Sequence, residues 1–390
     1  MFNTIYLLFL LLPVAFISGY FLGHKKPNNI KLDDKNIIPS DYIKGLNFLL
    51  NEQPDKAVQV FIDLLEVNEE TVETHLALGH LFRRRGEVNR AIRIHQNLVE
   101  RTSIEPEQRA RAIYQLGQDY LSAGLLDRAE KLFNELMEQK PQTQAAMQRL
   151  IEIYQQEKDW AKAIEITKRL AMNTEQDYTK IIAHYYCEQA EQMLRYNEPN
   201  KAIKLTKKAI RVNTLCARAS IIEGQVLVKM KKYKEALKAY QRVEHQNPEL
   251  LPEVIEQIKQ CYNQLDQNTK MRDYVFNVQS QYGGISLVLA WVDVLAKENS
   301  SSAEEFLIAY LKEKASVRAM DKLIDIKQID SIGSAQDNLN IIKSVTTQLL
   351  KTKSHYQCHS CGFLANIYHW QCPSCKGWDT IESLHWVDGE

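Results

Sequence analysis

Four cysteines gather near the C-terminal end of this 390-residue chain, at Cys358, Cys361, Cys372 and Cys375. They form two C-x2-C pairs that are separated by ten residues. Each pair can fold into a tight turn that presents two thiolates to one ion, and two such turns complete a tetrahedral site of four sulfurs. The spacing therefore predicts a structural metal site, because four protein ligands leave no coordination position for a substrate.

The identity of the ion stays open between iron and zinc, since thiolates bind both metals. Gly362 after the second cysteine and Pro373 after the third resemble the turns of rubredoxins, which implies that iron can be bound. Lys376 stands where the second rubredoxin turn usually has glycine, and the loop between the turns is shorter than in rubredoxins. The alternatives are a disulfide, or replacement of one thiol by a histidine of this region, His359, His369 or His385.

The segment that carries the cysteines is short, and this makes the metal part of its stability. Residues 351–390 are too few to bury a sufficient hydrophobic core alone, so a bound ion is expected to supply the missing free energy. Its tryptophans, Trp370, Trp378 and Trp386, are expected to pack this module onto the last helices of the chain. The remaining cysteines, Cys187, Cys216 and Cys261, are scattered and are expected to be buried, reduced thiols.

The middle of the chain repeats itself. A mostly small residue is followed twelve positions later by alanine, in the pairs Gly45/Ala57, Gly79/Ala91, Gly117/Ala129, Ile151/Ala163, Ala190/Ala202 and Gly224/Ala236. The steps between successive first members are 34, 38, 34, 39 and 34 residues. A large apolar residue follows each first member by three positions, and the pattern resembles the tetratricopeptide repeat. Stacked helix pairs of this kind form a continuous core and a concave face that usually binds proteins or peptides.

Two parts of the array depart from this pattern. Ile151 breaks the small-residue rule, so the fourth unit is expected to be splayed. After Pro252 the repeat fades, although apolar residues still recur at helical spacing. We therefore expect degenerate helix pairs up to about Leu350.

The N-terminal segment predicts a membrane anchor. No charged residue occurs between Phe2 and Gly23, and an 18-residue helix there would be about 27 Å long, close to the hydrocarbon thickness of about 30 Å. A cleaved signal peptide is the alternative, but no basic residue precedes the apolar run. Four lysines follow it, at Lys25, Lys26, Lys31 and Lys35. The positive-inside rule then places the N-terminus outside and the rest of the chain in the cytoplasm.

The composition argues against two other functional classes. Lys plus Arg equals Asp plus Glu, at 49 each, so no global field favours nucleic acid, and only Lys351, Lys353 and Lys376 lie near the cysteines. The sequence contains no phosphate-binding loop, no H-E-x-x-H, no G-x-S-x-G and no G-x-G-x-x-G motif, so nothing indicates an enzyme.

These observations together predict an all-α fold: a tetratricopeptide superhelix with an N-terminal transmembrane helix and a small C-terminal rubredoxin-like or zinc-ribbon module. The expected boundaries are an anchor at 1–23, a linker at 24–37, six clear repeats at 38–250, degenerate helical repeats at 251–350 and the metal module at 351–390. The sequence leaves self-association of the chain open.

This combination resembles the lipopolysaccharide assembly protein B family of Gram-negative inner membranes, most specifically in the stretches Tyr356–Phe363 and Trp370–Cys375. The resemblance implies a single-pass, non-enzymatic adaptor on the cytoplasmic side of the inner membrane. It implies control of lipopolysaccharide synthesis, through degradation of the deacetylase LpxC by the membrane protease FtsH and restraint by an inner-membrane regulator. A membrane scaffold that assembles the synthetic enzymes without affecting their turnover, and a rubredoxin-like redox or metal sensor, are the alternatives.

Overall fold

The computed structural model describes residues 40–50, 69–102, 104–137, 143–330, 332–352 and 354–384, with isolated positions at 20, 53, 56, 57 and 60. The chain divides into two compact units, residues 1–142 and 143–390. The predicted anchor and linker fall outside the described residues apart from Tyr20. Among the described helices, none combines the length and the apolar character needed to span a bilayer.

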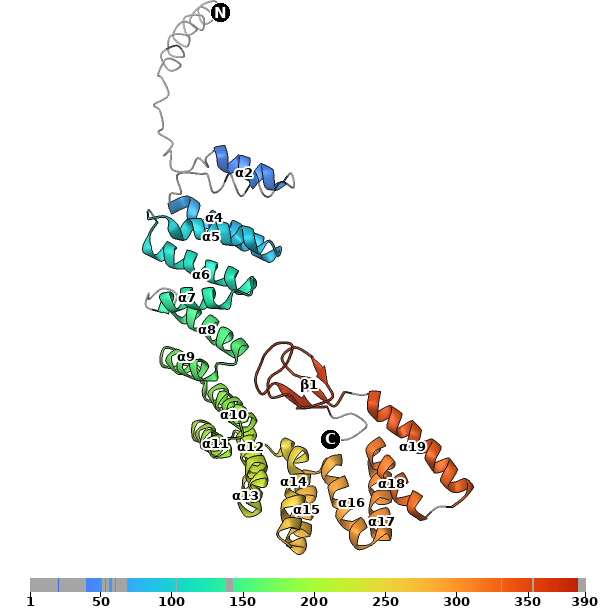
Figure 1. Ribbon diagram of the computed structural model, residues 1–390. Coiled ribbons are helices and arrows are strands. Elements are labelled where there is room, and N and C mark those ends of the chain that lie inside the picture. The colour runs from blue at the N-terminus through green and yellow to red at the C-terminus, as the bar shows by residue number, and fades with distance from the viewer. Residues whose placement is uncertain are drawn as a thin grey trace, which may run out of the picture. The chain divides into compact units, whose positions relative to one another are not determined.

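The first unit is built from helices that pack in consecutive pairs (Figure 1). Its described helices are α2 (Ser40–Leu50), α4 (Glu69–Arg84), α5 (Val88–Glu100), α6 (Pro106–Ser122) and α7 (Leu126–Met137). The predicted alanines of this unit, Ala57, Ala91 and Ala129, are all fully buried. The sequence pattern therefore marks the contact between the two helices of each pair.

The second unit continues the helical pairs and ends in a small sheet (Figure 1). Its paired helices are α8 (Thr143–Glu157) with α9 (Trp160–Met172), α10 (Thr179–Arg195) with α11 (Pro199–Val212), α12 (Ala217–Lys229) with α13 (Tyr233–Gln246), α14 (Leu251–Gln264) with α15 (Asn268–Tyr282), α16 (Ile285–Glu298) with α17 (Ser300–Glu313), and α18 (Val317–Asp330) with α19 (Ser334–Thr352). A short 3-10 helix, η3 (Pro248–Leu250), precedes α14. The predicted helical repeat architecture is confirmed.

The glycines of the repeat make room for a ring on the second helix of the pair. A Cβ at Gly224 would lie 2.5 Å from Cε1 of Tyr240, and one at Gly117 would lie 2.7 Å from the Phe133 ring. Each ring belongs to a residue four positions after the alanine of the repeat pattern, and both rings are buried. The close approach is therefore between a glycine backbone and an aromatic face, in addition to the alanine contact that the sequence indicated.

In the fourth unit the large side chain is on the first helix of the pair and the small one is on the second. Ile151 occupies the glycine position, and Thr167 stands where the other units have Phe133 or Tyr240. Both side chains are buried, and Ala163 is fully buried as in the other pairs. The smaller threonine provides the volume that isoleucine requires, so the pair remains packed where a splayed unit was expected.

The helix pairs from α4–α5 to α14–α15 each turn through one residue in the left-handed region, which in the first five of them stands seven positions after the first member of the repeat pattern. These residues are Gly86, Gly124, Lys158, Asn197, Lys231 and, in the α14–α15 pair, Asp266. The next backbone N–H then donates to the carbonyl of the large apolar residue on the first helix, as from Glu87 to Phe82 and from Gln267 to Tyr262. The α14–α15 pair therefore keeps the repeat's turn, although its small-residue signature has faded.

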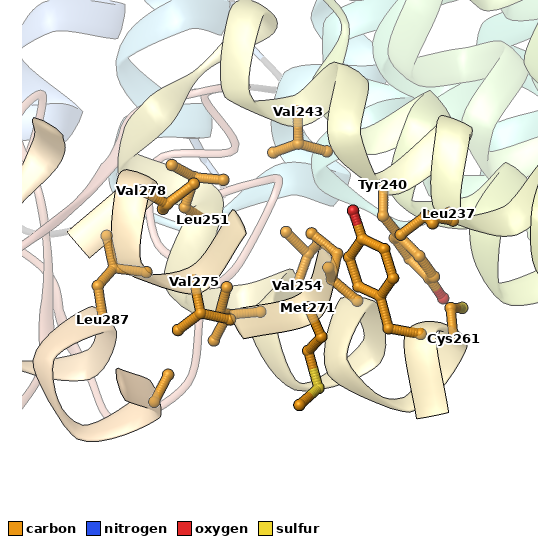
Figure 2. Close-up of a cluster of buried hydrophobic side chains, with 14 of the residues drawn as sticks. Leu237, Tyr240, Val243, Leu251, Val254, Cys261, Met271, Val275, Val278 and Leu287 are labelled. Atoms are coloured by element: carbon orange, nitrogen blue, oxygen red, sulfur yellow. The ribbon is translucent and has the colours of Figure 1, made fainter. Parts of the chain in front are cut away.

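The apolar core runs without interruption past Pro252. Figure 2 shows Tyr240 and Val243 of α13 beside Leu251 and Val254 of α14, with further side chains from α15 and α16. Of these, Val243, Leu251 and Val254 are fully buried. The helices from α12 to α16 thus form one continuous cluster within the second unit, which gives the metal module a rigid support.

Candidate metal centre

The metal module consists of two cysteine turns attached to a three-stranded antiparallel sheet. Its strands are β1 (Tyr356–Cys358), β2 (Leu364–Ala365) and β3 (Ile381–Ser383), in the order β2-β1-β3. Cys358 ends β1, and the first turn leads from it into β2. The second turn, with Cys372 and Cys375, is closed by a bridge between Gln371 and Trp378.

The two turns have the same hydrogen-bond pattern, displaced by fourteen residues. The N–H of Gly362 donates to the carbonyl of Cys358 at 2.8 Å, and the N–H of Lys376 donates to that of Cys372 at 2.9 Å. Gly362 and Lys376 have φ values of 76° and 60°. The second turn therefore keeps the rubredoxin-type backbone, although lysine replaces the glycine and adopts a conformation that costs a side-chain-bearing residue free energy.

The four thiols converge on one point. The Sγ atoms of Cys358 and Cys375 are 3.7 Å apart, those of Cys361 and Cys372 are also 3.7 Å apart, and all four lie within 4.8 Å of one another. Sulfurs at about 2.3 Å from a tetrahedrally coordinated ion are separated by about 3.8 Å. The four cysteines thus form a rubredoxin-like or zinc-ribbon metal site, and both iron and zinc fit this donor set.

The thiols of the site have unequal proton affinities. The nearby Thr380 hydroxyl, 3.4 Å from Sγ of Cys358, lowers the pKa of that thiol to about 6 against the effect of burial. The N–H of Gly377 lowers the pKa of Cys375, but partial desolvation and the three neighbouring thiols outweigh it and raise that pKa to about 11. A bound dication would stabilise all four thiolates at once, including that of Cys375 with its raised pKa.

Histidines take no part in the described cluster. Among the residues that the structure places, the cluster of possible metal ligands at this site contains only the four cysteines. His359 lies on the exposed first turn beside Ser360, and His385 falls outside the described residues. Cys358 and Cys372 are buried, whereas the second cysteine of each pair, Cys361 and Cys375, is exposed.

The tryptophans attach the module to the middle of the second unit, whereas the sequence analysis placed them against the last helices. The Trp378 ring packs against three aromatic partners: its centroid is 5.0 Å from that of His184, 5.9 Å from Tyr185 and 6.4 Å from Trp160. Those residues belong to α9 and α10. That prediction was wrong in its location, because the complementary rings and charges are carried by earlier helices. Trp386 lies outside the described residues.

A buried arginine lies at the centre of this contact. Arg218 on α12 is 3% exposed, and its guanidinium carbon is 5.7 Å from the ring centroids of both Trp370 and Trp378. Its Nη2 also donates to Glu188 at 2.7 Å and to Glu191 at 2.8 Å. Its Nε and Nη1 have no hydrogen-bond acceptor in the described part of the chain, so the tryptophan faces take that place.

Polar contacts fix the orientation of the module around this arginine. Oε1 of Gln155 on α8 accepts from Nε2 of Gln371 at 3.0 Å and from Nε1 of Trp378 at 3.2 Å. His184 Nε2 lies 2.8 Å from Oδ2 of Asp379. At the opposite edge the Tyr356 hydroxyl donates to Glu253 of α14. The module therefore contacts the first helices of four consecutive pairs, α8, α10, α12 and α14.

Sequence reasoning identified the metal ligands and missed the residues that hold the module in place. Arg218, His184 and Gln155 occur in ordinary helical stretches and have no motif around them. The signal in the sequence is the pair of tryptophans, Trp370 and Trp378, which indicates a contact but not the helices that it involves.

Comparison with known proteins agrees with this architecture. Residues 356–383 match the family described as a rubredoxin metal binding domain, and residues 74–110 and 120–183 match tetratricopeptide repeats. Lipopolysaccharide assembly protein B of Escherichia coli (strain K12) is 38% identical over 385 residues, covering 98% of this chain and 99% of that protein. The protein of the same name from Haemophilus influenzae is 33% identical, covering 97% and 98%.

The fold and the site define a tetratricopeptide-repeat protein that carries a rubredoxin-type metal module on its repeats. Similarity of this extent, over nearly the whole length of both chains, decides the family as well. The chain belongs to the lipopolysaccharide assembly protein B family.

Proposed function

We propose that this chain takes part in lipopolysaccharide assembly as an adaptor that binds other proteins and catalyses no reaction. The observation that carries the proposal is the similarity, over 98% of the chain, to a protein named for that process. The closed metal site supports the non-catalytic part, because four thiolates leave no position for a reacting group. The repeat array supports the binding part, since stacked helix pairs usually present a protein-binding face.

The proposal includes a membrane anchor at residues 1–23, with the remainder of the chain on the cytoplasmic side of the inner membrane. The support is the uncharged segment between Phe2 and Gly23 and the four lysines that follow it. An anchor would confine the array to the bilayer surface and raise its effective concentration near membrane-bound partners. Alkaline phosphatase fused to the C-terminus tests this topology, and phosphatase activity in cells would reverse it.

The finer proposal concerns the turnover of LpxC. We propose that the chain brings this deacetylase to the membrane protease FtsH, under restraint by an inner-membrane regulator, as the family resemblance implies. The surface that binds these partners would have two parts. One is the docked metal module, and the other is formed by exposed residues of the repeat helices. No chemistry by the chain itself is required for this role.

Depletion of the protein in its own host tests the finer proposal. The half-life of LpxC should lengthen on depletion, and re-expression of the full chain should restore it. A chain in which the anchor is replaced by an unrelated transmembrane helix separates confinement from specific contact within the membrane. An unchanged LpxC half-life would refute control of turnover, and capture of synthetic enzymes by the chain in that same experiment would favour a scaffold.

A further inference from the structure

Two of the cysteines outside the metal site lie in contact with each other. Cys187 on α10 and Cys216, which precedes the first residue of α12, have their Sγ atoms 3.9 Å apart. They are separated by 29 positions in the sequence and are 0% and 4% exposed. A disulfide requires Sγ atoms at about 2.05 Å, so closing the pair needs a shift of about 2 Å.

The two thiols differ in the way that a reacting pair requires. The contact with Cys187, helped by the nearby His184, lowers the pKa of Cys216 to about 7 against the effect of burial. Burial raises the pKa of Cys187 well above its ordinary value. At neutral pH one sulfur of the pair therefore has thiolate character, which an attack on an oxidant needs, and the other is a neighbouring thiol.

The metal module docks on residues beside this pair. Asp379 of the module contacts His184 and acts electrostatically on Cys216, whose pKa it raises. His184 itself stacks on Trp378, and Arg218, two residues after Cys216, faces the same ring. Release of the module would remove the ring that packs on His184 and Arg218 beside the thiols, and also the negative charge that disfavours the Cys216 thiolate.

We propose that Cys187 and Cys216 form an oxidisable dithiol whose access to hydrogen peroxide is controlled by docking of the metal module. The Cys216 thiolate attacks one peroxide oxygen, breaks the O–O bond and becomes a sulfenic acid, and the released hydroxide takes a proton to give water. The Cys187 sulfur then attacks the sulfenic sulfur and loses its proton as a second water leaves. The net change is two thiols and one peroxide to one disulfide and two waters.

This inference stands apart from the role in lipopolysaccharide assembly, because it concerns only the chain and a small oxidant. Loss of a metal ion that holds the module together would expose the dithiol to peroxide. Its oxidation would then join α10 covalently to the residue before α12. The dithiol would thus report on the state of the metal site while containing none of its ligands.

Peptide mapping of the peroxide-treated full chain tests the bond itself. The expected product is a 187–216 cross-link that disappears on reduction and is absent from the Cys187→Ser and Cys216→Ser variants. Cys261→Ser is the matched control, because that buried thiol belongs to a different cluster and its removal should leave the cross-link intact. Sulfinic acid at Cys216 without a cross-link, or a cross-link through Cys261, would overturn the proposal.

The same mapping at a series of reaction times tests the control by docking. Trp378→Ala removes the main aromatic contact and leaves the four metal ligands in place, and chelation of the metal provides a second route to release. Both treatments should accelerate formation of the 187–216 cross-link by about tenfold or more, since a buried group reacts only through local opening. An unchanged rate in both, with metal loss verified by elemental analysis, would show that docking does not control the pair.

Discussion

Replacement of Arg218 by methionine should loosen the metal module from the repeats. Methionine keeps an unbranched, apolar stem and removes the cation that faces Trp370 and Trp378. Each of these cation–π contacts is assigned about 1 kcal/mol, which lies within the range of about 0.5 to 2 kcal/mol for such contacts. The carboxylates of Glu188 and Glu191 lose their partner, but they are 21% and 34% exposed, so water limits that cost to about 1 kcal/mol in total.

The two cation–π contacts give an expected loss of about 2 kcal/mol in the free energy of docking, or roughly a thirtyfold increase in the open population of the module. The pairs with Glu188 and Glu191 join α12 to α10, so their loss lowers the stability of the repeats and leaves the docking free energy unchanged. Denaturant unfolding of the full chain followed by tryptophan fluorescence measures this, because Trp160, Trp370 and Trp378 all lie in the contact. A separate early transition should appear in Arg218→Met, and it should shift to lower denaturant concentration than the main transition.

Arg242→Met is the matched control. Arg242 lies on α13, is 42% exposed and pairs with Glu223. Loss of a pair of this kind costs less than about 1 kcal/mol, so the module transition should stay in place. Arg218→Lys should give an intermediate result, because lysine keeps the charge and lacks the planar group that stacks on two rings. A loss below about 1 kcal/mol in Arg218→Met would refute the view that the cation holds the module.

Four further outcomes follow from the packing, the metal site and the titration of the thiols. Gly224→Ala should destabilise the second unit by about 1–3 kcal/mol in denaturant unfolding, because the added Cβ would lie 2.5 Å from the Tyr240 ring; an unchanged midpoint would show that the ring can move aside. Gly362→Ala should cost the metal module about 1 kcal/mol, measured as weaker resistance to a competing chelator, because its φ of 76° is unfavourable for alanine while the space around it is free. Removal of the metal by chelation should abolish the protection of the β1–β3 amides from hydrogen exchange and leave that of α12–α16 nearly intact, and equal loss in both would contradict a purely local role for the ion. Alkylation of Cys216 in the Trp378→Ala variant should be slow below the pKa of its thiol and should level off above it. That pKa should lie below the value of about 7 that holds with Asp379 in place, because Asp379 raises it, and a rate independent of pH would refute the assigned thiolate.

The sequence by itself determined the elements whose physical cause is local. The two C-x2-C turns close through hydrogen bonds between residues four or five positions apart, so their spacing was sufficient to predict the metal ligands. The helix pairs are equally local, since one small residue, one alanine and one turn recur within a single repeat of about 34 residues. Volume exchange, as between Ile151 and Thr167, also occurs inside one pair, but it requires both members to be considered together.

Only the tertiary structure decided where the metal module docks and which thiols meet. Gln155 accepts hydrogen bonds from side chains that are 216 and 223 positions away, and no periodic pattern links residues at such separations. The contact depends on the curvature of the stacked helices, which brings Arg218 and His184 to the face that the module's rings can reach. That curvature is a sum of small rotations between successive pairs, so it belongs to the assembled array and to no single segment of the sequence.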